Sequence, residues 1–258
     1  MVQIKNETFT ETEYDSHFKD AASFELSDFQ KWAIKGIREG DNVLITAHTG
    51  SGKTLPAEYM IKYFTTLAER DGRERKRVIY ASPIKALSNQ KLFDMRLKFP
   101  EVSFGLLTGD CKDNPEADVL IMTTEILRNT LFNKRMGTIT EQTEMPLSFD
   151  MDIDNDLGGV IFDEVHYIND ADRGSVWEQS ILLLSPKVQL LMLSATIDSP
   201  EHFASWIEDE KAKQSSQLDI TPRGMVLAPT DHRVVPLTHY MWLSAPRGAM
   251  KKLTKTDQ

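Results

Sequence analysis

The sequence of 258 residues is poor in several features that would each point to a particular class of protein. It has one cysteine, Cys111, which excludes an internal disulfide. No run approaches the roughly 18 apolar residues that cross a bilayer, and the opening MVQIKNETFTETEYDS lacks the apolar core of a signal peptide. The six histidines show no metal-ligand spacing. We therefore expect an intracellular protein, cytoplasmic or nuclear, with no membrane partner and no structural zinc.

An excess of positive charge is also missing. The 39 acidic and 30 basic residues give a formal net charge of -9, which argues against a protein that coats nucleic acid through bulk positive potential. Any nucleic acid strand must therefore meet a local groove. The acidity is uneven, since residues 141 to 164 contain eight acidic and no basic residues. Locally basic runs at 70 to 77 and 247 to 255 are typical of solvated loops or chain ends.

Short apolar runs alternate with longer stretches of helical period. Because the runs are apolar at nearly every position, they predict a mostly parallel sheet buried between helices on both faces, in a three-layer α/β fold. Ala86, Leu87, Gln90 and Phe93 recur at three- and four-residue intervals, which predicts a helix after the second strand. The other expected strands and helices are strands at 42–47, 77–82, 104–107, 119–123, 159–163 and 188–193, and helices at 53–68, 125–132, 175–184 and 200–208.

Two stretches break this alternation. Between Asn133 and Leu157 the chain is polar and then acidic, which indicates a surface insertion, placed at 137–156. Beyond Asp209 the run KAKQSSQ and three prolines are typical of an exit linker with one or two short strands. We accordingly divide the chain into an N-terminal extension (1–22), a main domain (23–242) and a linker or tail (243–258).

A phosphate-binding loop, AHTGSGKT, lies between the first buried strand and the following helix. Backbone N–H groups and a helix N-terminus in this position hold phosphates, while Lys53 reaches the β and γ positions and the Thr54 hydroxyl ligates Mg²⁺. An ordinary glycine turn is the alternative, but the flanking strand and helix disfavour it. The expected nucleotide-binding residues of the loop are His48, Thr49, Gly50, Ser51, Gly52, Lys53 and Thr54.

A second chemical motif, DEVH at 163–166, follows the apolar strand GVIF. The strand would deliver Asp163 and Glu164 to the carboxyl edge of the sheet, beside the phosphate loop. There Asp163 can hold Mg²⁺, and Glu164 can orient and deprotonate the water that attacks the γ-phosphate. Two adjacent carboxylates could also cap a helix, but their pairing with the phosphate loop favours catalysis by Lys53, Asp163 and Glu164.

The phosphate loop and DEVH together resemble the DExH branch of superfamily-two helicases, especially the superkiller-like RNA helicase group. The resemblance implies a RecA-like domain that uses ATP and Mg²⁺, in which His166 joins the catalytic residues by coupling nucleotide state to strand grip. Phe24 and Gln30, in FELSDFQ, resemble the family's adenine-reading element, where a ring stacks on the base and an amide pairs with its edge. A core phenylalanine and an exposed glutamine are the alternative for these two residues.

Three further segments resemble the family's strand-contacting motifs: SPIKALSNQK at 82–91, LTGD at 107–110 and TTEILR at 123–128. Loops rich in Thr, Gly and Ser offer donors to phosphates without reading bases, so sequence-independent binding is expected. Ser194 and Thr196, in SAT after a buried strand, resemble the coupling motif, with hydrogen bonds expected to Asp163 or His166. The expected nucleic-acid contacts are Pro83, Lys85, Thr108, Gly109, Thr123, Thr124 and Arg128.

The resemblance covers residues 24–240 and implies the N-terminal, ATP-binding motor domain of an ATP-dependent RNA helicase. It departs from the family in the acidic insertion and in the absence of a second motor domain, although 236–240 resembles the crossing into one. The expected partners are single-stranded RNA and that second domain, and the isolated domain is expected to be monomeric. A DNA helicase of the same family and a nucleotide-sensing module without catalysis are the alternatives; a P-loop kinase or GTPase would lack SAT and the strand-contacting segments.

Overall fold

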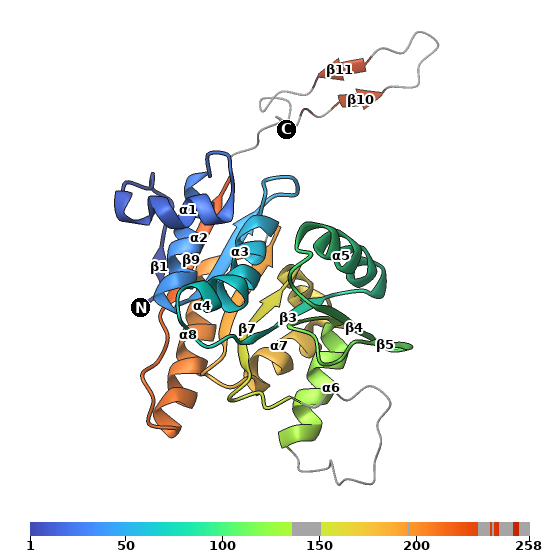
Figure 1. Ribbon diagram of the computed structural model, residues 1–258. Coiled ribbons are helices and arrows are strands. Elements are labelled where there is room, and N and C mark those ends of the chain that lie inside the picture. Colours follow the sequence, from blue (N-terminus) through green and yellow to red (C-terminus); the bar gives the residue numbers. More distant parts are fainter. Residues whose placement is uncertain (136–150, 196, 232–237, 239, 243–249, 253–258) are drawn as a thin grey trace.

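A computed structural model describes residues 1–135, 151–195, 197–231, 238, 240–242 and 250–252 (Figure 1). In this part of the chain a nine-stranded sheet has the order β1-β9-β2-β8-β7-β3-β6-β4-β5, and every neighbouring pair is parallel except β4 and β5. A separate antiparallel pair joins β10 to β11. The strands are β1 Gln3–Ile4, β2 Asn42–Ala47, β3 Arg77–Ser82, β4 Phe104–Thr108, β5 Cys111–Asp113, β6 Val119–Thr123, β7 Leu157–Phe162, β8 Gln189–Ser194, β9 Met225–Thr230, β10 Tyr240–Trp242 and β11 Met250–Lys252.

Helices cover both faces of the large sheet, as the sequence predicts (Figure 1). Successive side chains of a strand point to opposite faces, so β2 sends Val43 and Ile45 into one core and Leu44 into the other. The first core also contains residues from α1, α2, α3 and α5, and the second contains residues from α6, α7 and α8. The helices are α1 Asp15–Ala21, α2 Asp28–Glu39, α3 Thr54–Phe64, α4 Thr66–Arg70, α5 Lys85–Lys98, α6 Thr124–Arg135, α7 Gly174–Leu183 and α8 Pro200–Gln217, with 3₁₀ turns η1 Thr12–Tyr14 and η2 Val165–Asn169.

The N-terminal residues belong to the same sheet and core. Strand β1 pairs with β9 at the sheet edge, and Phe9 and Phe18 are buried in the first core. The ring of Phe9 meets that of Trp32 on α2 at a centroid distance of 4.6 Å. Residues 3–18 therefore contribute apolar contacts to the domain that follows them.

Two sequence expectations were wrong in detail. The helix expected at 53–68 is interrupted at Thr65, where α3 ends and α4 begins. The helix expected at 200–208 continues to Gln217, so the run KAKQSSQ is helical and not a linker. The next segment forms β9, a short strand of the kind expected beyond Asp209, and it lies inside the large sheet between β1 and β2.

The helix α5 forms as expected, but the residues whose spacing predicted it do not form its buried face. Ala86, Gln90 and Phe93 are exposed, and the residues that face the core are Ser88, Met95 and the adjoining Phe99. The pattern therefore located the helix without identifying its buried side.

The acidic insertion lies mostly outside the described residues, as do Thr196, much of the crossing expected at 236–240 and most of the tail 243–258. Its described end packs on the domain, because Met151 is buried and its carbonyl accepts a hydrogen bond from Lys134. No helix within the described ranges has both the length and the apolar character needed to span a membrane.

Candidate functional site

The predicted chemical motifs all follow the carboxyl ends of neighbouring parallel strands. The phosphate loop follows β2, SAT follows β8 and DEVH follows β7, and these strands are adjacent in the order β2-β8-β7. The strand-contacting segments follow β3, β6 and β4, the next three strands in the same direction. Ligands of open parallel sheets bind at this edge because the loops there converge. The fold thus brings two predicted sites to one edge, side by side.

The phosphate loop is shaped by two glycines in left-handed backbone conformations. Gly50 has φ +84° and Gly52 has φ +87°, a region that residues with a Cβ rarely adopt. At Gly50 nothing lies within 4 Å of where a Cβ would be, whereas at Gly52 a Cβ would lie 2.6 Å from Nε2 of Gln30. The helix α3 begins at Thr54, so the loop ends on a helix N-terminus suited to anions.

Gln30 joins the first turn of α2 to this loop. Its Oε1 accepts a hydrogen bond from the Ser27 N–H at 3.0 Å, and its Nε2 donates to the Gly52 carbonyl at 3.1 Å. The side chain is 5% exposed, so it is not the exposed glutamine of the alternative reading. Each amide atom still has one further hydrogen-bonding position.

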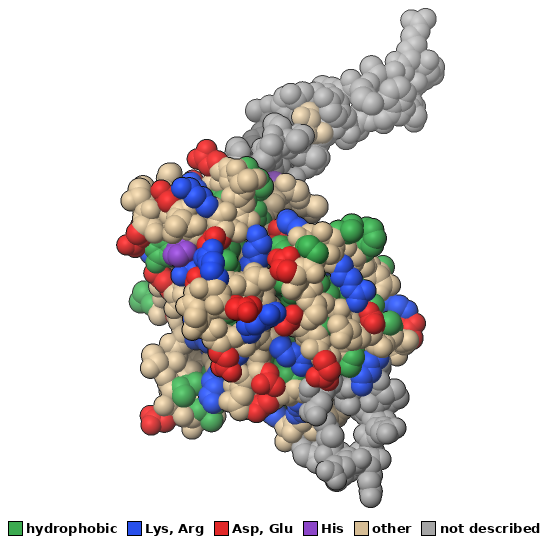
Figure 2. Space-filling view, in the orientation of Figure 1, with side chains coloured by type: hydrophobic (Ala, Val, Ile, Leu, Met, Phe, Trp, Pro, Cys, Tyr) green, Lys and Arg blue, Asp and Glu red, His purple; other side chains and the backbone are tan. Residues whose placement is uncertain are grey.

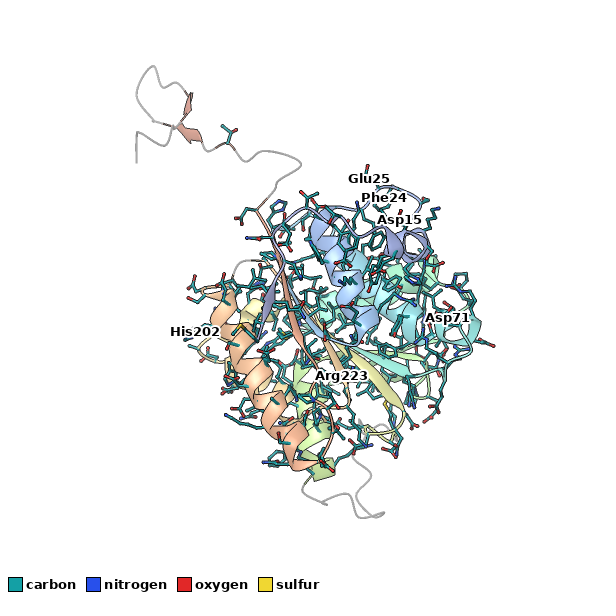
Figure 3. All side chains as sticks on the ribbon, turned by 90° about the vertical axis from the view of Figure 1, so that its left-hand side faces the viewer. Asp15, Phe24, Glu25, Asp71, His202 and Arg223 are labelled. Atoms are coloured by element: carbon teal, nitrogen blue, oxygen red, sulfur yellow. The ribbon has the colours of Figure 1, made fainter. Side chains whose placement is uncertain are left out.

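Phe24 is not a core residue either, because it is 63% exposed. Figure 3 shows Phe24 beside Glu25 on the loop before α2, at the edge of the molecule. The ring is therefore accessible for stacking, and adenine reading by Phe24 and Gln30 stays a prediction.

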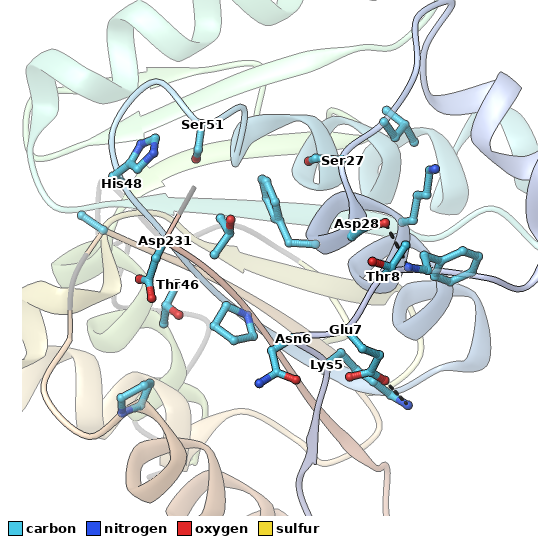
Figure 4. Close-up of a pocket in the computed structure, with 18 of the residues that line it drawn as sticks. Lys5, Asn6, Glu7, Thr8, Ser27, Asp28, Thr46, His48, Ser51 and Asp231 are labelled. Carbon is cyan, nitrogen blue, oxygen red and sulfur yellow. Dashed lines mark hydrogen bonds and ion pairs between the residues drawn. The ribbon is translucent and has the colours of Figure 1, made fainter. Parts of the chain in front are cut away.

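A groove of about 1100 Å³ opens next to the phosphate loop (Figure 4). Thr46, His48 and Ser51 line one side, while Lys5 to Phe9 and Glu25 to Phe29 line the other. The His48 ring nitrogen Nδ1 lies 3.1 Å from the Thr49 carbonyl oxygen. The hydroxyl of Ser51 is buried, and the described part of the chain offers it no hydrogen-bond partner. The groove has the size of a small-ligand site and reaches the phosphate loop at one end.

Lys53 faces the acidic motif. It is 7% exposed, and its Nζ donates to Oε2 of Glu164 at 2.8 Å. The two side chains come from loops 111 residues apart in sequence. Glu164 itself has a left-handed backbone, φ +53° and ψ +47°, at the turn from β7 into η2. The expected catalytic lysine and carboxylate therefore lie in direct contact.

Asp163 is buried and held by two donors. Its Oδ1 accepts the Glu164 N–H at 3.0 Å, and its Oδ2 accepts the Tyr80 hydroxyl at 2.6 Å. Burial first, and then the charge of Asp163, raises the pKa of Tyr80 well above its ordinary value. Tyr80 therefore stays a hydroxyl donor at neutral pH. The sequence analysis did not predict a role for Tyr80. The one indication in the sequence is a hydroxyl-bearing ring inside the buried strand RVIYAS.

The expected metal ligands Thr54 and Asp163 fit a cation between them. The ammonium group of Lys91 already lies 3.5 Å from Thr54 Oγ1 and 3.8 Å from Asp163 Oδ2. Within the described ranges no group of three or more His, Cys, Asp or Glu is placed to hold a metal ion. Mg²⁺ commonly binds through one or two protein oxygens plus substrate phosphates, so this sparse donor set suits a nucleotide-borne magnesium.

His166 links the acidic motif to SAT. Its Nδ1 lies 3.3 Å from Glu164 Oε2 and 3.5 Å from the backbone N of Ala195. A protonated Nδ1 donates to Glu164 and an unprotonated one accepts from Ala195, so the proton position selects the partner. The SAT segment therefore contacts His166 through the backbone of Ala195. The hydroxyl of Ser194, which was expected to make such a contact, is buried and has no hydrogen-bond partner in the described structure. Thr196 lies outside the described residues.

Two threonine hydroxyls form hydrogen bonds in the strand-contacting segments, one between two segments and one within a segment. Thr124 Oγ1 donates to the Ser82 carbonyl at 3.2 Å, and Thr108 Oγ1 donates to Asp110 Oδ1 at 3.2 Å. Thr108, Thr123 and Thr124 are all buried. In this conformation the hydroxyls of Thr108 and Thr124 bond within the protein.

Lys85 is the accessible cation of these segments, with a half-exposed side chain that pairs with Asp110. Pro83 is buried just before it, and an added Cβ at Gly109 would meet nothing within 4 Å. Arg128 carries a buried Nε that lacks a hydrogen-bond partner among the described residues. The face in Figure 2 intersperses basic and acidic side chains over its described residues without a continuous basic stripe.

Comparison with known proteins places the chain among helicases. Residues 27–203 match the family described as DEAD/DEAH box helicase. The chain is 42% identical to the antiviral helicase SKI2 of Saccharomyces cerevisiae and 41% identical to the human exosome RNA helicase MTR4, each over 85% of this chain and over 14% and 18% of those proteins. The structure of the Mycobacterium smegmatis helicase Lhr bound to ssDNA and AMP-PNP matches with a TM-score of 0.54 at 26% identity, covering 85% of this chain and 28% of Lhr.

Proposed function

Because the chain belongs to the DEAD/DEAH box helicase family, we propose that it is the ATP-binding half of an ATP-dependent RNA helicase. The chain spans less than a fifth of the length of SKI2 and MTR4, so the activity proposed is that of a motor to which this domain contributes one half. The observation that carries the proposal is the 2.8 Å contact between Lys53 of the phosphate loop and Glu164 of the acidic motif. Lys91 lies between Thr54 and Asp163, and the groove is lined by His48 and Ser51 of the same loop.

ATP binding would exchange the partners of Lys53. In the structure Lys53 neutralises Glu164 through a 2.8 Å contact. Phosphate oxygens offer the lysine a more strongly charged partner, and its move toward them would free Glu164 to orient and deprotonate a water molecule. Thr54 and Asp163 would hold Mg²⁺, which neutralises charge on the phosphates when bound. His166 contacts both Glu164 and Ala195, so movement of Glu164 would alter the contact between His166 and the SAT segment.

RNA is the proposed strand because MTR4 is named an RNA helicase, although Lhr was solved with ssDNA. The loops after β3, β6 and β4 present backbone groups and Lys85 rather than base-reading side chains, which favours sequence-independent contact with phosphates. A competition between RNA and DNA strands of the same sequence tests the choice: preference for RNA supports it, and equal or tighter DNA binding assigns the domain to a DNA helicase.

A second RecA-like motor domain is the proposed partner. The phosphate loop and the acidic motif would supply the magnesium and β-phosphate side of the site, and within the described ranges no arginine pairs with Asp163 or Glu164. An arginine from a facing domain is typically worth about 10³ to 10⁵ in the rate of phosphoryl transfer. The 258-residue chain alone should therefore bind nucleotide but hydrolyse it slowly.

Nucleotide binding by the 258-residue chain tests the site itself. Titration of ADP in the presence of Mg²⁺ should give saturable binding, and Lys53→Ala should weaken it by about tenfold or more through loss of a charge-assisted contact. Lys98→Ala is the matched control, since Lys98 pairs with Glu58 on the surface. Equal affinities of wild type and Lys53→Ala would overturn the assignment of the phosphate site.

A further inference from the structure

Lys91 is a lysine of α5 whose ammonium group points into the predicted metal site. Its side chain is 20% exposed, and its Nζ lies between Thr54 Oγ1 at 3.5 Å and Asp163 Oδ2 at 3.8 Å. The same Nζ lies 5.6 Å from the centroid of the Tyr80 ring, whose hydroxyl holds Asp163. Lys91 thus contacts both side chains that are expected to hold the metal, and it comes from a helix that contributes none of them.

We propose that Lys91 is a positioning residue of the metal site: its ammonium group holds Thr54 and Asp163 while the metal is absent and competes with Mg²⁺ for Asp163. The inference rests on the proposed nucleotide-binding function and adds a regulator of metal affinity to it.

The charges around the site support this role. Asp163 and Glu164 bring two negative charges, Lys53 balances Glu164 at 2.8 Å, and Lys91 is the cation nearest the buried Asp163. Once Mg²⁺ with its nucleotide occupies the space beside Asp163, Lys91 faces a like charge at close range. Like charges at this separation repel, so Lys91 must withdraw or lower the affinity for the metal.

The location of Lys91 on α5 connects this competition to the strand-contacting loop. The helix begins at Lys85, six residues before Lys91 and about 9 Å away along the helix axis. Withdrawal of the ammonium group from Asp163 would therefore act on the helix whose first turn is expected to meet the strand. Metal binding and strand binding would affect each other through α5, and such coupling is reciprocal.

The test measures how much Mg²⁺ the 258-residue chain needs to bind ADP. Calorimetric titration with ADP over a series of free Mg²⁺ concentrations gives the concentration at which the affinity enhancement is half-maximal. Lys91→Met and Lys91→Gln should lower that concentration by about tenfold, since both remove the competing charge and the glutamine keeps a polar end should the methionine variant fail to fold. Lys91→Arg should stay within twofold of wild type because it keeps the charge. Lys98→Met, on the same helix but paired with Glu58, should also stay within twofold.

A merely structural lysine would leave the Mg²⁺ requirement unchanged or raise it by disordering Asp163, so either result in the Met and Gln variants overturns the inference. Failure of Lys91→Arg to restore the wild-type requirement would also contradict a role carried by charge. If wild type binds no ADP in Mg²⁺, the proposed function fails and the inference with it. ADP binding with an unchanged metal requirement in the variants refutes the inference alone.

Discussion

Alanine substitutions at the two left-handed glycines of the phosphate loop should lower the free energy of unfolding by unequal amounts. Gly50 and Gly52 have nearly the same φ, +84° and +87°, so a Cβ brings a similar backbone strain of roughly 1–2 kcal/mol at either position. At Gly50 nothing more is expected, because no atom lies within 4 Å of the new Cβ. At Gly52 the Cβ would lie 2.6 Å from Nε2 of Gln30, so that amide must move.

The moved amide loses its 3.1 Å bond to the Gly52 carbonyl and loosens the 3.0 Å bond to Ser27. A net hydrogen bond contributes about 0.5–1.5 kcal/mol, so Gly52→Ala should cost about 1–2 kcal/mol more than Gly50→Ala. For a chain of this size that difference lowers the melting temperature by roughly a further 2–8 °C.

Urea unfolding of both variants, of Gln30→Ala and of the Gln30→Ala/Gly52→Ala double variant measures the difference. Without the Gln30 amide the additional cost of Gly52→Ala should disappear, giving an interaction free energy of about 1–2 kcal/mol. Equal losses in the two glycine variants, or fully additive losses in the double variant, would refute the reasoning.

Three further predictions concern single side chains. In a protein with both motor domains, Glu164→Gln should keep the Mg²⁺-dependent affinity for ADP and lose ATP hydrolysis, because the amide cannot accept a proton from water. Asp163→Asn should instead weaken that affinity. Equal losses of ADP affinity in calorimetry would contradict the assignment of Glu164 as base and Asp163 as metal ligand. Tyr80→Phe should lower the free energy of unfolding by about 1–3 kcal/mol because Asp163 Oδ2 loses its buried donor. Tyr59 is also buried but has only a 3.4 Å contact with Arg38, so Tyr59→Phe should lower the free energy of unfolding less. Similar losses for the two variants in urea unfolding would argue against the Tyr80–Asp163 bond. Burial lowers the pKa of Lys211 to about 7 from 10.5. Between these pH values the unfolded chain binds more protons than the folded chain, so the free energy of unfolding should rise with pH. Lys211→Met should lack this part of the rise, and parallel pH profiles of the variant and wild type would contradict the prediction.

The sequence predicted those parts of the fold that depend on local pattern. The residues of β2, β3 and β6 agree with the expected strands at both ends, because each contains three or four consecutive apolar residues with polar residues close by. The phosphate loop and DEVH are contiguous motifs, and the parallel topology brings them together.

Contacts between distant segments could not be predicted in this way. The continuation of α8 was hidden by Lys211 and Ser215, which are polar but buried, and Lys211 donates to the carbonyls of Ile181 and Leu184 near the end of α7. Lys91 and Tyr80 reach Asp163 only because α5, β3 and β7 meet in space. No spacing along the chain indicates such a meeting.

We propose that this domain forms one side of an ATPase site that a second motor domain completes. The most direct measurement is the rate of ATP hydrolysis with saturating single-stranded RNA, for the 258-residue chain and for a chain extended through a second motor domain. We expect hydrolysis near background for the first chain and a rate at least about 10³ times higher for the second, and Lys53→Ala should abolish the higher rate. Comparable rates in the two chains would contradict it.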